Sequence, residues 1–313
     1  MEPLAPGMRR IGAVLRHLPG ASVATSTDAQ IAQRSGAGAP EVVASILMGV
    51  RPKGVTAEDR EADGIPMRIY RPDRPGSGRP LVLYLHGGGF VFGDLRGGDW
   101  IAGTVAKQLD AVVVSVDYRL APKHPFPAAV DDCFAGLVWA AAHAAELGAD
   151  AGRIGVMGES AGGNLAAVVA LMARDGSGPL LRHQALLYPA TGVDDSASRR
   201  ENANAVILSA ADMRRFDELY AGDRSDWRVA PIKAPTFAGL PPALIVVGGH
   251  DPLHDDGVRY AEALETADVP VRLVDYPAMP HGFLNFPRFA KDAVPAMKQV
   301  VFAQRRALAG REV

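Results

Sequence analysis

The sequence is poor in cysteine, balanced in charge and free of long apolar runs. Cys133 is the only cysteine among 313 residues, so no internal disulfide can form. The 33 basic and 35 acidic residues leave a formal net charge of −2, which argues against a nucleic-acid partner or a polybasic membrane anchor. No run of about 18 apolar residues occurs, so we expect no membrane span. The cysteine usage is compatible with a reducing compartment, and we expect a cytoplasmic protein.

The sequence also has few residues or patterns that would indicate a metal site or a reactive thiol. Cys133 lies in an alanine-rich stretch, which favours a buried structural thiol over a nucleophile. No His-Glu-x-x-His spacing or comparable metal-ligand pattern is present. We therefore expect neither a metal ion nor an organic cofactor, and the chemistry must come from ordinary side chains.

Apolar runs alternate with helical patterns from about residue 51 onward. Runs typical of buried strands are Leu81–Leu85, Val112–Val116, Ile154–Met157, Ala185–Tyr188, Ala243–Val247 and Val271–Val274. Helices are predicted over Asp99–Leu109, Ala128–Leu147, Ala161–Ala173, Asp255–Ala267 and Ala290–Leu308. A hairpin joined at Asp63-Gly64 is predicted before them, from Val55–Ala62 to Met67–Tyr70. This pattern predicts an α/β fold with a mostly parallel sheet and helices on both faces.

Two segments stand outside this alternation. Residues 1–50 contain two amphipathic helix candidates, Met8–Leu18 and Pro40–Val50, separated by the small and polar link Ser22–Gly38. Residues 190–235 form a long insertion with one predicted helix, Ala210–Tyr220, and Ser209 as its N-cap. We expect the arm 1–50 and the insertion 190–235 to form a cap over a core of residues 51–189 and 236–313. A peripheral elaboration without function is the alternative.

A Gly-x-Ser-x-Gly sequence marks the most informative position in the chain. Ser160 lies in Gly158-Glu159-Ser160-Ala161-Gly162-Gly163, between an apolar run and a helical run. A strand, this turn and a helix are the layout of a nucleophile elbow, which lifts the serine hydroxyl out of the sheet. The alternative interpretation is a glycine-rich helix start with a capping serine.

A histidine and three glycines directly follow the apolar run Leu81–Leu85. The sequence His86-Gly87-Gly88-Gly89 matches the oxyanion motif of lipases and esterases. We expect the oxyanion donors to be N–H groups of Gly87 or Gly88, together with that of Ala161 after the serine. No Gly-Lys-Ser/Thr follows, which disfavours a phosphate loop. We interpret His86 as a structural residue that holds the loop.

A weak serine nucleophile needs a base and an orienting acid. Asp251 follows the apolar run Ala243–Val247, and His281 follows Val271–Val274. The order Ser160, Asp251, His281 is that of an α/β-hydrolase triad. The alternative role for Asp251 is helix capping, for which Asp255 and Asp256 are better placed.

Six motifs in this order resemble the hormone-sensitive lipase family of α/β-hydrolases, in its bacterial esterase branch. They are His86-Gly87-Gly88-Gly89, Tyr118-Arg119-Leu120-Ala121-Pro122, His124-Pro125-Phe126-Pro127-Ala128-Ala129, Gly158-Glu159-Ser160-Ala161-Gly162-Gly163, Asp251-Pro252-Leu253 and His281-Gly282-Phe283. The resemblance implies a helical cap and a serine carboxylesterase acting on small to medium acyl esters. It also implies Ser160 as nucleophile, His281 as base and Asp251 as the orienting acid, and it suggests a homodimer through the edge strand near Val271–Val274.

The chain departs from the family pattern at two positions. Glu159 stands where Asp or Thr is common before the serine, and Lys123 stands where Glu is common. We expect Glu159 to influence the electrostatics near His281. Two other functions stay open: a binding protein on the same fold, which His281 disfavours, and an amidase or deacetylase using the same three residues.

Overall fold

The computed structural model describes residues 2–17, 22–35 and 45–310, and these are built around an eight-stranded sheet. The strands lie in the order β1-β2-β4-β3-β5-β6-β7-β8. Strands β3 to β8 are parallel, whereas β1 pairs with β2 and β2 with β4 in antiparallel fashion. Their bounds are β1 Val55–Ala62, β2 Ile65–Pro72, β3 Arg79–Leu85, β4 Val112–Val116, β5 Ala149–Glu159, β6 Leu181–Leu187, β7 Ala243–His250 and β8 Val271–Pro280.

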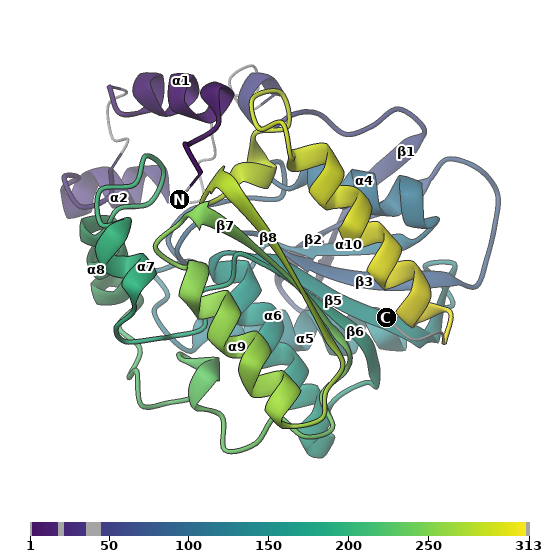
Figure 1. The fold of residues 1–313 in the computed structure, drawn as a ribbon. Coiled ribbons are helices and arrows are strands. Elements are labelled where there is room, and N and C mark those ends of the chain that lie inside the picture. Colours follow the sequence, from purple (N-terminus) through teal and green to yellow (C-terminus); the bar gives the residue numbers. More distant parts are fainter. Residues whose placement is uncertain (1, 18–21, 36–44, 311–313) are drawn as a thin grey trace.

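Helices cover both faces of this sheet (Figure 1). Helices α4 and α10 pack on one face, and α5, α6 and α9 pack on the other. The α-helices are α1 Pro6–Leu15, α2 Asp28–Arg34, α4 Asp99–Leu109, α5 Ala128–Ala142, α6 Ala161–Met172, α7 Ala197–Glu201, α8 Ala210–Tyr220, α9 His254–Thr266 and α10 Ala293–Leu308. Shorter turns of helix are η1 Ala173–Ser177, η2 Pro231–Lys233 and η3 Phe283–Asn285.

The central strands are buried because each face of the sheet carries its own hydrophobic cluster. Successive residues of a strand point to opposite faces. Leu83 of β3 therefore packs with Leu165 of α6 in one cluster, while Val82 packs with Ile101 of α4 in the other. Every residue of β3 and of β4 is buried. This arrangement confirms the α/β fold predicted from the apolar runs.

Some predicted boundaries differ from the structure. The link Ser22–Gly38, described from the sequence only as small and polar, contains helix α2, which starts at a capping box between Thr27 and Gln30. The prediction missed this helix because it is short and buries only Ile31. Helix α5 ends at Ala142 rather than Leu147, since turns follow. The predicted helix Pro40–Val50 lies partly outside the described residues, and in its described part residues 45–47 are helical.

The N-terminal arm and the insertion meet at the carboxyl ends of the strands (Figure 1). Asp212 of α8 links them, because it accepts hydrogen bonds from the Ser22 hydroxyl and from the Ala24 N–H. The same aspartate completes a capping box with Ser209, the N-cap predicted for α8. Across the described ranges, none of the helices is long and apolar enough to cross a bilayer.

Candidate active site

Ser160 lies on a sharp turn between β5 and α6, in a backbone conformation that L-residues rarely adopt. Its φ is 55° and its ψ is −119°. The turn leaves no room for side chains nearby: a Cβ on Gly158 would lie 2.0 Å from the Gly162 carbonyl oxygen. A Cβ on Gly162 would lie 2.1 Å from the Leu85 carbonyl oxygen. The Ser160 side chain makes no capping hydrogen bond to α6, so the capping interpretation is wrong.

Ser160, His281 and Asp251 form a continuous hydrogen-bonded chain. The Ser160 hydroxyl lies 2.8 Å from Nε2 of His281, and Nδ1 of His281 lies 2.8 Å from Oδ2 of Asp251. Asp251 is fully buried and His281 is 7% exposed. The other oxygen of Asp251 accepts the Leu253 N–H at 2.8 Å, which fixes the carboxylate plane. Ser160, Asp251 and His281 each directly follow the carboxyl end of a strand, namely β5, β7 and β8.

Asp255 and Asp256 do not cap helix α9, contrary to the sequence expectation. The helix begins at His254 without a side-chain cap. Asp255 accepts the Ser198 N–H, and buried Asp256 pairs with Arg199 of α7. Both aspartates therefore hold the insertion against the core.

The glycine loop after β3 packs directly against the elbow. A Cβ on Gly87 would lie 3.1 Å from the Glu159 carbonyl oxygen and 3.3 Å from Cβ of Ser160. Gly88 has a φ of 124°, which favours glycine strongly. Gly87, Gly88, Gly89 and Ala161 line the same cavity as Ser160. The loop therefore brings backbone close to the hydroxyl.

His86 is bonded within its own loop and not to Ser160. Its Nδ1 lies 2.8 Å from the Gly87 carbonyl oxygen, and its ring stacks on Tyr118 at 4.2 Å between centroids. The Tyr118 hydroxyl donates to the His86 carbonyl oxygen at 2.7 Å. Burial lowers the pKa of His86 below its ordinary value, so its ring stays neutral.

Glu159 is buried beside the elbow and holds three donors. Its Oε1 accepts the Tyr84 hydroxyl at 2.8 Å, and its Oε2 accepts the Tyr188 hydroxyl at 2.9 Å and the Asn285 amide. Burial, and after it the Glu159 charge, raises the pKa of both tyrosines well above its ordinary value. Both hydroxyls therefore keep their protons and donate. The sequence prediction missed Tyr84, Tyr188 and Asn285, which belong to no motif that carries chemistry.

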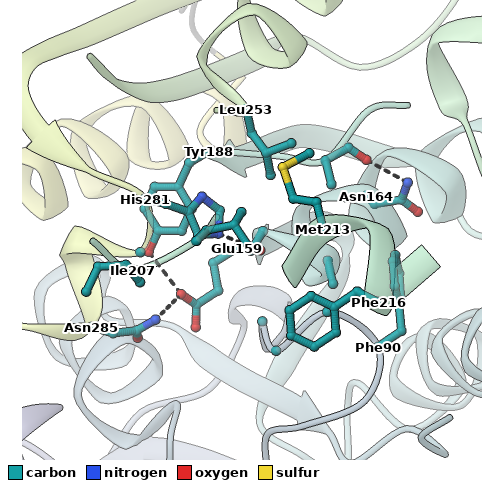
Figure 2. A pocket seen from close by; sticks show the side chains of 18 of the residues that line it. Phe90, Glu159, Asn164, Tyr188, Ile207, Met213, Phe216, Leu253, His281 and Asn285 are labelled. Atoms are coloured by element: carbon teal, nitrogen blue, oxygen red, sulfur yellow. Dashed lines mark hydrogen bonds between the residues drawn. The ribbon is translucent and has the colours of Figure 1, made fainter. Parts of the chain in front are cut away.

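A cavity of about 360 Å³ opens over Ser160, and its walls are mainly apolar (Figure 2). Residues of the insertion form much of the wall; they are Ile207, Leu208, Met213 and Phe216. Leu15 and Met48 contribute from the N-terminal arm. Two other apolar residues of the insertion lie elsewhere, since Val206 packs over Gly12 and Leu219 is buried in the core cluster.

The remaining candidates lie outside this cavity. Lys123 is exposed on the surface. Cys133 is buried in α5, and burial raises the pKa of its thiol well above the ordinary value, as a structural role requires. In the parts of the chain that the structure describes, no group of three or more His, Cys, Asp or Glu side chains could hold a metal ion.

Comparison with known proteins finds a family of this fold and relatives that are named esterases. A family model for the α/β-hydrolase fold matches residues 82–285. Esterase LipI of Mycobacterium tuberculosis is 45% identical over 261 residues, which cover 81% of this chain and 82% of the relative. Carboxylesterase NlhH of the same species is 46% identical over 251 residues, covering 78% and 79%.

Solved structures show the same likeness. A Pyrobaculum calidifontis esterase has a TM-score of 0.84 at 35% identity, covering 97% of this chain and 98% of its own. The ester hydrolase EH1AB1 from the metagenome of Lake Arreo, solved with a bipyridine phosphonate derivative, has a TM-score of 0.86 at 34% identity, covering 96% and 98%. Fold and site together define an α/β-hydrolase. The chain belongs to the hormone-sensitive lipase family within that fold.

Proposed function

We propose that Ser160, His281 and Asp251 are the catalytic triad of this carboxylic ester hydrolase, and that it acts through an acyl-enzyme. The observation that carries the proposal is the chain of two 2.8 Å hydrogen bonds from the Ser160 hydroxyl to the buried Asp251. A neutral serine hydroxyl is a weak nucleophile and needs such a base. The chain of contacts supports an enzyme over a binding protein on the same fold.

In the first half-reaction, His281 accepts the Ser160 proton through Nε2 while Oγ attacks the ester carbonyl carbon. Asp251 holds the imidazole in the tautomer that leaves Nε2 free, and it stabilises the imidazolium. The proton then passes from Nε2 to the leaving alkoxide, and an alcohol departs. In the second half-reaction, His281 activates water, which attacks the acyl-serine and releases the acid.

The developing oxyanion needs donors that face it from a fixed backbone. The N–H groups of Gly87 or Gly88 and of Ala161 are the proposed donors. Support comes from the packing of the glycine loop on Ser160 and from the start of α6 at Ala161. One such donor is worth about 2.7–4 kcal/mol of transition-state stabilisation.

The arm 1–50 and the insertion 190–235 are proposed to form the cap over the core of residues 51–189 and 236–313. Asp212 ties the two segments together, and both contribute apolar side chains to the cavity. A cavity of about 360 Å³ suits acyl groups of short to medium length. The substrates are therefore proposed to be uncharged esters of such acids.

The proposal is tested with p-nitrophenyl esters of increasing acyl length. Ser160→Ala is expected to lower kcat by about 10⁶ while leaving the fold intact. Ser77→Ala, at an exposed position away from the cavity, serves as the matched control and should keep its activity. Near-normal turnover by Ser160→Ala would sink the proposal.

A further inference from the structure

A buried carboxylate sits between the nucleophile and the loop that carries His281. Glu159 is 2% exposed and accepts hydrogen bonds from Tyr84, Tyr188 and Asn285. A charge in such a place is unfavourable unless its oxygens are well paired. Both oxygens are paired, by Tyr84 of β3, by Tyr188 directly after β6 and by Asn285 of η3. Figure 2 shows the hydrogen bonds from Tyr188 and Asn285.

The two oxygens of Glu159 face different parts of the site. Among the residues that the structure describes, only Tyr84 of β3 donates to Oε1. Oε2 accepts the donors that adjoin the histidine. The Tyr188 ring meets the His281 ring nearly edge-on, at 5.1 Å between centroids and 67° between planes. Asn285 lies in η3, on the loop that begins at His281.

Tyr188 is held in an unusual backbone conformation at this point. Its φ is 38°, a region that non-glycine residues rarely occupy. Such conformations persist where the surrounding structure enforces them, and they cluster at functional sites. Here the Tyr188 N–H donates to the Val246 carbonyl oxygen at 2.6 Å, and the ring is fully buried. Tyr188 is therefore held at two points, by the hydrogen bond of its hydroxyl and by that of its backbone N–H.

We propose that Glu159 is a positioning residue, which acts through Tyr188 and Asn285 to hold the His281 imidazole against Ser160. The proposal rests on the catalytic roles assigned above to Ser160 and His281. Oε2 anchors the ring that packs on the imidazole and also anchors the loop that carries it. Loosening either anchor lets the imidazole shift, and small displacements in a reacting pair reduce the rate strongly.

The chain offers a matched pair of variants for this test. Tyr84→Phe and Tyr188→Phe each remove one buried hydroxyl donor from the same carboxylate, at 2.8 Å and 2.9 Å. Only Tyr188 contacts His281. Tyr188→Phe is expected to lower kcat by about tenfold with KM within about twofold, the effect of losing a hydrogen bond to a charged group. Tyr84→Phe should keep kcat within about twofold of the wild type.

A second pair tests the anchor at Asn285 by exchanging the two groups. Asn285→Asp sets a carboxylate against Oε2, and is expected to lower kcat by at least about tenfold at pH 9, where a proton shared between them is disfavoured. Adding Glu159→Gln restores an amide facing a carboxylate, because the amide is now at position 159 and the carboxylate at position 285. The double variant should recover at least about half of the decrease in log kcat that Asn285→Asp causes.

The outcomes are separated by measuring thermal unfolding and Ser160 labelling by a phosphonate alongside kcat. Loss of kcat in Tyr188→Phe and Asn285→Asp, with Tyr84→Phe unaffected and the double variant recovered, supports the positioning role. Equal losses for both tyrosine variants, or no recovery, overturn it and leave Glu159 a structural group. Failure of the wild type to label at Ser160 would instead overturn the proposed function itself.

Discussion

The Asp251 carboxylate lies 2.8 Å from Nδ1 of His281 through Oδ2, while its Oδ1 accepts the Leu253 N–H at 2.8 Å. The second hydrogen bond prevents the carboxylate from rotating, so the orientation of the imidazole is set before substrate binds. Because Asp251 is fully buried, no water competes for the histidine N–H.

Asp251→Asn is therefore expected to lower kcat by about 10⁴, because the amide favours the wrong imidazole tautomer. The structure should be retained, since asparagine has the same shape. Steady-state kinetics with a p-nitrophenyl ester measure the loss. The control is Asp63→Asn, the same substitution at an exposed position. Asn164→Asp is unsuitable as a control because Asn164 donates hydrogen bonds to two carbonyl oxygens. A loss below about tenfold would contradict the orienting role of Asp251.

Gly87→Ala tests the approach of the glycine loop to the elbow. The added methyl group would lie 3.1 Å from the Glu159 carbonyl oxygen and 3.3 Å from Cβ of Ser160, closer than ordinary contacts. We expect kcat to fall by about tenfold or more as the loop shifts. Gly155→Ala, whose methyl group would meet atoms only at 3.5 Å and beyond, is the control within β5. Similar kinetics for both variants would exclude a precise role for the loop.

Phe216→Ala tests whether the insertion sets the acyl length. Phe216 lines the cavity and lies directly over Gly89, where a Cβ would come within 2.4 Å of its ring. Removing the ring lengthens the cavity beside Ser160. The ratio of kcat/KM for a decanoate over a butyrate ester is expected to rise by about tenfold, the effect of one or two buried methylenes. Phe302→Ala, on the exposed side of α10, should leave that ratio unchanged.

His183 is expected to make the fold sensitive to acid. It is fully buried in β6, both ring nitrogens lack a hydrogen-bond partner among the described residues, and burial lowers its pKa to about 3. The folded state thus binds fewer protons than the unfolded state, whose histidine has a pKa of about 6.5. The free energy of unfolding therefore falls as the pH drops from about 6.5 toward 3, by up to about 1.4 kcal/mol per pH unit.

His183→Leu should remove this contribution, so that the free energy of unfolding depends less steeply on pH by about the same slope. Urea unfolding at pH 7.5, 5.5 and 4.5 compares the two proteins. The variant should lose less stability than the wild type between the highest and the lowest pH. An unchanged pH slope would show that another group is responsible.

The elements of the fold were predictable because each has a local signal. The apolar runs of β3 and β4 are buried on both faces, and Ser209 caps α8 in the structure as the sequence indicated. Helix α2 was not predicted, because seven residues with one buried side chain show no hydrophobic periodicity. Ser160, Asp251 and His281 were predictable as candidates because each follows its own strand in the expected order.

The contacts of Glu159 could not be read from the sequence. Asn285 is 126 positions away and Tyr84 is 75 positions away, so their pairing depends on tertiary packing. Leu219 shows the same limit, since the helical pattern of α8 does not say which of its apolar residues faces the cavity and which faces the core.

The most direct measurement is the stoichiometry and site of labelling by a p-nitrophenyl alkylphosphonate, read by intact-protein and peptide mass spectrometry. The wild type should take up one phosphonyl group per chain, on Ser160, with loss of ester hydrolysis in the same proportion. His281→Ala should label much more slowly, because Ser160 loses its base. No adduct, an adduct on another residue, or full esterase activity after Ser160 is labelled would contradict the assignment of Ser160 as the nucleophile.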